Sequence, residues 1–446
     1  MKEEKHYGLF TAVSMIVGIC VGSGIFFKAD DILGATGGNV ALGILVFCIG
    51  AFSIIFGSIT LTQLANRTEK TGGVVAYFEE FISDKAASAF GWFQLFVYLP
   101  TITVVVSWVS GIYTCMLLGL PNTLETQTLI GTGYMAFFFL LNYFSLRLGG
   151  YFQNLATIMK LIPLIAIAFV GIFWKEPAPI VPPELAVPIT NVGWGWLAAL
   201  APMAFSYDGW TIATNITHEV KNAKRTMPMA LTIGPLLVLA IYLTYFSGLV
   251  SIAGPEYILA MGDEATTTVG ISLLGERGGS IILSFVLIAI LGVTNGVIMG
   301  ILRLPQALAE KNMLPNSAKV KQIDPKSQLS PVAAQIAFAI AFVWMALHYL
   351  TQKSGIMGGG DVSEIAIVFS YLTYVILYLK VISMKKEGVI TSPFFGWIMP
   401  VFAIMGSAII LIGGIVSNPT YVPVFILFCF VVCFIGYKYY EKKITV

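Results

Sequence analysis

The stretch Met15-Ile-Val-Gly-Ile-Cys-Val-Gly-Ser-Gly-Ile-Phe-Phe27 decides how the rest of the chain is interpreted. It lies in an apolar run long enough to cross a bilayer, but Gly18, Gly22, Ser23 and Gly24 interrupt that run. Glycine costs roughly 1 kcal/mol relative to alanine inside a helix, so the cluster predicts that the helix opens here. Lipid cannot satisfy the freed backbone groups, which must face protein or water. The stretch therefore predicts a binding site or, as the alternative, a small-residue packing face.

The composition is that of a membrane protein. Of the 446 residues, 57% are hydrophobic and 11% are charged, with a mean hydropathy of +0.86. Soluble domains carry about 25% charged residues, so we expect an all-α polytopic membrane protein in a lipid bilayer. The net charge of +2 gives no reason to expect a nucleic-acid partner. The five cysteines lie in or beside apolar runs without paired spacing, so neither a disulfide nor a metal or other cofactor is expected.

A window of about 20 apolar residues divides the chain into twelve predicted transmembrane spans. These spans cover about 8–33, 40–65, 87–119, 127–146, 150–174, 193–217, 227–252, 279–308, 331–351, 361–383, 394–416 and 420–440. Lysine and arginine gather in the loops on one side, which predicts that both termini are cytoplasmic. We expect two five-span repeats, 8–174 and 193–383, followed by two further spans in 394–440.

A second interruption supports the idea of two repeats. Span 6 reads Pro202-Met-Ala-Phe-Ser-Tyr-Asp-Gly-Trp210, with an acid and a glycine in mid-membrane. Five is an odd number of spans, so the second repeat must run in the opposite direction through the membrane. Paired interruptions at the start of inverted halves are typical of a transporter site at the bilayer midplane. At 1.5 Å per residue, Gly18, Ser206 and Lys160 all lie about 15–20 Å deep, close enough to share one cavity.

Lys160 is a cation inside an otherwise apolar span, where insertion costs at least about 2.5–3.5 kcal/mol. It is expected to meet carbonyls freed at the opened helix, around Gly18. The alternative, snorkelling to the cytoplasmic face, would require the side chain to reach past about ten residues of helix. An ammonium fixed at the break would take the place of a sodium ion, which predicts sodium-independent transport.

Other polar and aromatic residues in the spans have open roles. Asp208 would recognise a cationic substrate group, relay protons or accept hydrogen bonds in the unwound segment, and the last role is favoured. Phe205 would cover a midplane ligand or simply pack. Tyr242 and Tyr245 would offer hydroxyls to the site or be satisfied core tyrosines, and Asn295 would hydrogen-bond within the bundle. No catalytic constellation is recognisable, so an enzyme is not expected.

Three motifs together resemble a known superfamily. They are Gly22-Ser-Gly-Ile-Phe26, Phe205-Ser-Tyr-Asp-Gly-Trp210 with Glu219, and Asn295-Gly-x-x-x-Gly300 followed by Arg303 and Ala309-Glu-Lys-Asn-Met-Leu-Pro315. The chain resembles the amino acid–polyamine–organocation (APC) superfamily, and within it the L-amino-acid transporter (LAT) branch with its bacterial alanine–serine–cysteine exchangers. This resemblance implies a LeuT-type fold of five-plus-five inverted repeats, with broken helices 1 and 6 and spans 11 and 12 outside the core.

The resemblance also implies roles for individual residues. Backbone N–H groups from Val21 through Gly22 and Ser23 to Gly24 would bind a substrate carboxylate, helped by a half-helix dipole. Carbonyls of Cys20 and of Ala204, Phe205 and Ser206 would hold the substrate ammonium. Phe205 would be the gate, Lys160 near Gly18 the sodium substitute, and Tyr242 a tyrosine that completes the site.

The combined interpretation is a sodium-independent, alternating-access exchanger of small neutral L-amino acids such as alanine, serine and cysteine, in a bacterial plasma membrane. The alternatives are a proton-coupled uniporter or symporter, a transporter that also accepts cationic amino acids, and, from another class, a channel or sensor. The human members of the branch carry an external cysteine that links a glycoprotein subunit. Residues 119–125 hold no cysteine, so no disulfide-linked ancillary subunit is expected.

Overall fold

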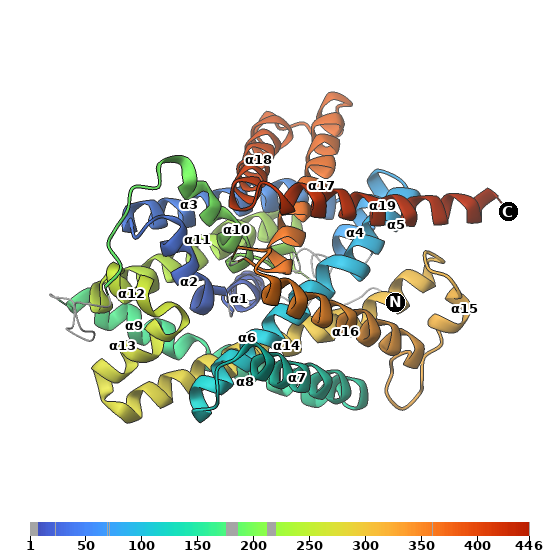
Figure 1. The fold of residues 1–446 in the computed structure, drawn as a ribbon. Coiled ribbons are helices and arrows are strands. Elements are labelled where there is room, and N and C mark those ends of the chain that lie inside the picture. The colour runs from blue at the N-terminus through green and yellow to red at the C-terminus, as the bar shows by residue number, and fades with distance from the viewer. Residues whose placement is uncertain are drawn as a thin grey trace.

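The computed structural model describes residues 8–22, 24–68, 70, 72–174, 186–211, 220–358 and 360–445. Every regular element in these ranges is a helix (Figure 1). Nine helices of the described part are long and apolar enough to cross a membrane: Val40–Ala65, Asp84–Leu118, Arg147–Phe173, Arg225–Ala253, Arg277–Glu310, Pro331–Ser354, Val362–Lys386, Phe394–Ser417 and Tyr421–Ile444. The expected all-helical, polytopic architecture is therefore confirmed.

The long segments carry the following labels in Figure 1. They are α3 (Val40–Ala65), α5 (Asp84–Phe93), η1 (Gln94–Tyr98), α6 (Leu99–Leu118), α8 (Leu146–Met159), α9 (Leu161–Phe173), α11 (Ala223–Ala253), α14 (Glu276–Glu310), α16 (Pro331–Ser354), α17 (Val362–Lys386), η6 (Phe394–Ile398), α18 (Met399–Ser417) and α19 (Tyr421–Thr445).

Three further predicted spans are also helical in the described residues but are not among the nine long apolar helices. The first is divided into α1 (Leu9–Cys20) and α2 (Gly24–Ala35), and the sixth into η3 (Gly193–Ala199) and α10 (Leu200–Ser206). The fourth corresponds to α7 (Leu124–Phe144). Both interruptions fall where glycines and an aspartate break the apolar pattern of the sequence.

Two prolines explain irregular points in long helices. Proline has no N–H and its ring crowds the carbonyl four residues earlier. Pro163 therefore ends α8 at Met159, and Lys160 stands at the junction with α9. Pro100 likewise cannot donate to the carbonyl of Phe96, which lies within η1, a π-helical turn. The indole Nε1 of Trp344 donates a hydrogen bond to that carbonyl at 2.7 Å. π-Helical turns inside α-helices are frequent at functional sites.

Two connecting segments are structured. Residues 66–86 contain α4 (Gly73–Phe81), whose Phe78 stacks on Phe90 with ring centroids 4.8 Å apart. Residues 254–277 contain α12 (Pro255–Met261), η5 (Gly262–Glu264) and α13 (Ala265–Leu274). The second segment is thus a run of three short helices.

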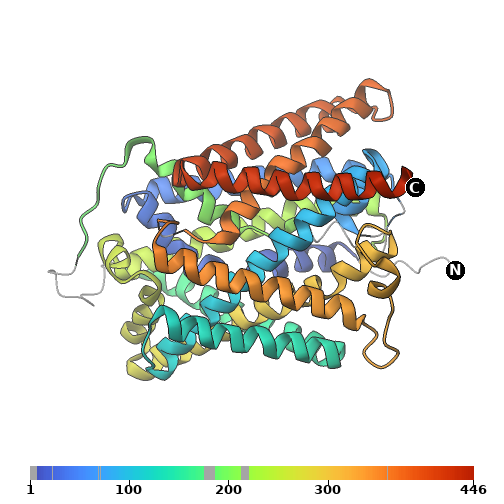
Figure 2. The same ribbon diagram turned by 45° about the vertical axis from the view of Figure 1, so that its right-hand side comes forward.

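The interrupted helices lie inside the bundle. α1 packs on α11, while α10 packs on α2 and α17 (Figure 1). The last two long helices flank this group, α18 on α3 and α17, and α19 on α5, in the upper part of the view in Figure 2. Glycines permit the closest crossings: a Cβ on Gly171 of α9 would lie 2.2 Å from the Cα of Gly248 on α11, and one on Gly292 of α14 would lie 2.4 Å from the Cβ of Ala156.

The crossing of α9 and α11 generates a stability prediction. Gly171→Ala would force the two backbones apart, and overpacking of this kind costs about 1–3 kcal/mol. Gly133→Ala in α7 is the matched control, because a Cβ there meets nothing within 4 Å. We expect thermal unfolding in detergent to shift downwards for Gly171→Ala alone. Equal melting temperatures for the two variants would contradict this account of the crossing.

Candidate functional site

The first break leaves the end of α1 without helical continuation. The chain turns at Val21, whose backbone is extended (φ −72°, ψ 94°), and helix resumes at Gly24. Cys20 and Val21 are buried, as is Gly22, whereas Ser23 lies outside the described residues. The last carbonyls of α1 have no intrahelical donor, so their partners must come from elsewhere in the bundle.

The second break touches the first. α10 ends at Ser206, and Gly209 adopts a left-handed backbone (φ +91°) in the turn that follows. The hydroxyl of Ser206 donates to the carbonyl of Gly24 at 3.2 Å and to that of Pro202 at 3.1 Å. A Cβ on Gly24 would lie 2.6 Å from the Cα of Ser206, so only glycine permits this approach.

Tyr242 of α11 joins the two breaks. Its hydroxyl lies 2.7 Å from the carbonyl oxygen of Cys20 and 2.6 Å from that of Ser206, and the side chain is fully buried. A tyrosine hydroxyl has one hydrogen to donate, so the two carbonyls share a single donor. The C-terminal ends of α1 and α10 thus converge on one small polar point.

Lys160 reaches the same region from the junction of α8 and α9. Its Nζ donates a hydrogen bond to the carbonyl of Gly18, and the residue is 3% exposed. The side chain therefore points into the bundle and does not snorkel to either end of it. Gly18 itself has room for a Cβ, with Thr157 Cγ2 at 3.6 Å, so its contribution here is the carbonyl oxygen.

Asp208 is held by a residue that sequence reasoning missed. The hydroxyl of Tyr98 lies 2.7 Å from both carboxylate oxygens of Asp208 and donates to them. Tyr98 is the last residue of η1, so the π-helical turn before Pro100 sets its position. A proline two residues after a tyrosine within an apolar span was the signal available in the sequence.

Phe205 and Ala204 are buried beside the junction of the breaks. A Cβ on Gly24 would lie 3.2 Å from Cδ1 of Phe205, so the ring packs against the start of α2. Lys28, one turn further along α2, places its Nζ 5.7 Å from the ring centroid of Phe205. Lys28 is a second contact that the sequence did not predict.

Two residues predicted as possible contributors serve helix packing. Asn295 of α14 accepts from Asn142 Nδ2 at 2.8 Å and donates to the carbonyl of Gly149 at 3.0 Å, which ties α14 to α7 and α8. The hydroxyl of Tyr245 is 2.9 Å from that of Thr266 in α13. The described hydrogen bonds of both residues thus lead away from the breaks.

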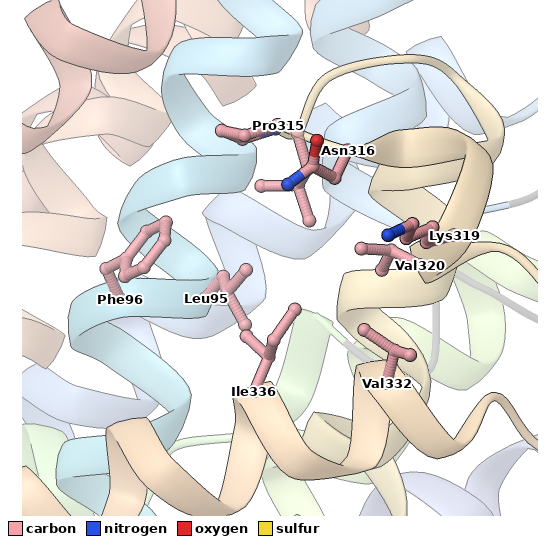
Figure 3. Close-up of a pocket in the computed structure, with 9 residues that line it drawn as sticks. Leu95, Phe96, Pro315, Asn316, Lys319, Val320, Val332 and Ile336 are labelled. Carbon is pink, nitrogen blue, oxygen red and sulfur yellow. The ribbon is translucent and has the colours of Figure 1, made fainter.

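A cavity of about 350 Å³ lies at another place in the bundle (Figure 3). It is framed by η1, the short helix α15 (Ser317–Val320) and the start of α16, and its lining is mainly apolar. Lys319 and Asn316 are the polar side chains drawn at its edge in Figure 3. None of the residues at the two breaks lines this cavity.

The geometry at the breaks fits a ligand that carries both signs of charge. The N-terminus of α2 offers backbone N–H groups and the positive end of a helix dipole. The last carbonyls of α1 and α10 offer acceptors and negative dipole ends close by. Among the described residues no group of three or more His, Cys, Asp or Glu side chains is arranged to hold a metal ion.

Comparisons with known proteins place the sequence in a family. The sequence profile of the family described as "Amino acid permease" matches residues 7–436. The serine/threonine exchanger SteT of Bacillus subtilis is 28% identical over 420 residues, which cover 93% of this chain and 92% of that protein. The b(0,+)-type amino acid transporter 1 of Mus musculus is 25% identical over 98% of this chain and 89% of its own length. The human Asc-type amino acid transporter 1 is 28% identical over 70% of this chain and 60% of its own length.

The family match covers both interrupted helices and nearly the whole chain. The similar proteins are named as transporters of amino acids, which are zwitterions, and the two helix ends suit a zwitterion. The chain belongs to the amino acid permease family, in the LAT branch of the APC superfamily.

Proposed function

We propose that this protein is a sodium-independent exchanger of small neutral L-amino acids across a bacterial plasma membrane. The observation that carries the proposal is the meeting of the two helix breaks at Gly24 and Ser206, with the hydroxyl of Tyr242 shared between the carbonyls of Cys20 and Ser206. The whole chain would form a LeuT-type fold of twelve spans, with inverted repeats in 8–174 and 193–383, with 394–440 outside the core, and with both termini in the cytoplasm.

In this proposal the substrate binds between the breaks. Its carboxylate is held by backbone N–H groups of Val21 to Gly24 at the start of α2. Its ammonium is held by the carbonyls of Cys20 and of Ala204 to Ser206. Tyr242 contacts two of these carbonyls directly, so the hydroxyl orients the acceptors for the substrate ammonium.

Lys160 would replace the cation that steadies an opened helix in sodium-coupled carriers. The support is its burial and its hydrogen bond to Gly18, one turn before the break. A permanently tethered ammonium does not dissociate, so the fold would need no sodium ion. Alternating access follows if substrate draws α2 and α10 together, with Phe205 as the gate, and exchange follows if the empty carrier seldom reorients.

Small neutral substrates suit the crowding at the breaks. The backbones of Gly24 and Ser206 are in contact and Phe205 packs on the same side, which leaves little room for a long side chain. The carboxylate of Asp208 accepts from Tyr98 and so has a partner within the protein. This favours a structural hydrogen-bond role over recognition of a cationic amino acid or proton relay.

With no cysteine in 119–125, we propose that the transporter works without a disulfide-linked subunit.

The direct test is uptake of a labelled amino acid panel into proteoliposomes, with and without internal amino acid, sodium and a proton gradient. We expect uptake of alanine, serine or cysteine only when the vesicles contain amino acid, at the same rate in sodium and in choline. Uptake into empty vesicles driven by a pH gradient would instead support a proton-coupled carrier.

The Lys160 contact generates a second prediction. Lys160→Ala leaves the Gly18 carbonyl without its buried donor, which costs about 1–3 kcal/mol, roughly a five-fold to 150-fold change in an equilibrium. Exchange should fall by at least about five-fold, while Lys353→Ala, a change at an exposed lysine, should leave it unaltered. Unchanged exchange by a monodisperse Lys160→Ala protein would contradict the assigned role.

The Asp208 contact generates a third prediction. Asp208→Asn keeps an acceptor for Tyr98, so the ratio of arginine to alanine transport should stay as in the native protein. Tyr98→Phe removes the hydrogen-bond donor from a half-buried carboxylate and should lower thermal stability more than Asp208→Asn does. A selective change in arginine transport by Asp208→Asn would show that the carboxylate recognises cationic substrates.

A further inference from the structure

Lys28 lies in α2, one turn beyond Gly24, and is 2% exposed. The proposed function does not use it. Its Nζ lies 2.6 Å from a carboxylate oxygen of Glu364, 2.9 Å from one of Asp361 and 3.0 Å from one of Asp31. We call these four residues the Lys28 cluster. Asp361 and Glu364 belong to the start of α17, so the cluster joins the outer half of the first broken helix to a distant span.

The Lys28 cluster also contacts the proposed gate. The ammonium of Lys28 lies 5.7 Å from the ring centroid of Phe205, within the range of a cation–π interaction. Three elements, α2, α10 and α17, therefore meet at one charged side chain. Separation of α2 from α17 would break the contacts of Lys28 with Asp361 and Glu364 together.

The charges in the Lys28 cluster do not balance. Three carboxylates face one ammonium, so full ionisation leaves an excess of two negative charges. The side chains of Lys28, Asp361 and Glu364 are 3%, 3% and 7% exposed, and Asp31 alone is partly open at 39%. An unpaired charge taken out of water costs several kcal/mol, which uptake of a proton removes.

Further titratable groups lie around the Lys28 cluster. The described hydrogen bonds give no partner to Oδ1 of Asp30 or to either ring nitrogen of His348, a residue that is fully buried on α16 beside Trp108. Burial, followed by the charge of Asp31, raises the pKa of Asp263 in η5 to about 7. The titratable groups that face the cluster or its neighbours are Asp30 and Asp31 of α2, Asp361 and Glu364 of α17, His348 of α16, Asp263 of η5 and Tyr113 of α6.

We propose that the Lys28 cluster is a proton-binding site that latches the external gate, holding α2 against α17 while a proton is bound and releasing that proton when the gate opens. The inference rests on the proposed alternating-access function and on the predicted external position of this end of α2. A proton fits better than a metal ion, because Lys28 already supplies the cation and no described carboxylate group is arranged to hold a metal.

The sign of the pH effect follows from this arrangement. Closure buries the carboxylates, so the closed state binds the proton more tightly than the hydrated, open state. By linkage, a lower external pH stabilises the closed gate. The external half-saturation concentration for substrate should therefore rise on acidification, by up to about ten-fold per pH unit where one proton is coupled.

The test is alanine exchange in proteoliposomes at fixed internal pH, with external pH varied between about 8 and 6. The variant is Glu364→Gln, whose amide resembles the protonated acid. We expect it to show, at alkaline pH, the high half-saturation concentration that the native protein shows at acid pH, and to be insensitive to external pH. Glu125→Gln, at an exposed ion pair, should keep the native profile.

A second variant keeps the test decisive if Glu364→Gln does not fold. Asp31→Asn changes the partly exposed member of the cluster and should shift the pH midpoint downwards, since one source of repulsion is removed. A native profile that is flat with pH, or an unaltered pH dependence in the folded cluster variants, would overturn the latch. Failure of the proposed function looks different, because the native protein would then exchange no amino acid at any pH.

Discussion

Backbone groups freed inside a membrane must find partners within the protein, and this constraint shapes the centre of the bundle. Lipid offers no hydrogen bonds, so a helix opens at mid-depth only where side chains or a ligand replace its lost bonds. Here Lys160 donates to the carbonyl of Gly18, and the hydroxyl of Tyr242 is shared by the carbonyls of Cys20 and Ser206. Side chains of neighbouring helices therefore satisfy the carbonyls that the breaks free.

Much of this arrangement follows from residue type and depth along the chain. Glycines weaken the first helix, an aspartate and a glycine weaken the sixth, and a lysine is costly in lipid, so each feature must face the interior at a calculable depth. Counting 1.5 Å per residue placed Gly18 and Lys160 at one level, and their hydrogen bond lies there. Helix boundaries also follow the apolar runs closely, because the bilayer allows few alternatives to a helix.

The contacts that escaped prediction depend on neighbours far apart in sequence. Tyr98 reaches Asp208 because Pro100 disturbs the helix into a π-helical turn, and depth arithmetic alone gives no rotation about the helix axis. Lys28 meets Asp361 and Glu364 across more than 330 positions of sequence. A charged residue near the end of a span, such as Lys28, is expected to face solvent, but here the packing of α17 buries it. Asn295, by contrast, is predicted to hydrogen-bond within the bundle, and its hydrogen bonds join α14 to α7 and α8.

The two halves of the first broken helix thus carry different attachments. α1 is tied to α9 and α11 through Lys160 and Tyr242, whereas α2 is tied to α10 and α17 through Ser206 and Lys28. The break at Val21 and Gly22 separates these two differently anchored halves. In the proposed mechanism this separation lets one side of the bundle open while the other stays closed. The positive charge of Lys28 beside Phe205 links the proposed gate to α2.

The central claim is that the paired breaks bind the amino acid, and an experimental structure in lipid nanodiscs with saturating L-alanine tests it most directly. The account predicts ligand density between the start of α2 and the end of α10, with the carboxylate towards Gly24 and the ammonium towards the carbonyls of Cys20 and Ser206. Density elsewhere, such as in the cavity beside η1, with the breaks unchanged by alanine, would contradict it.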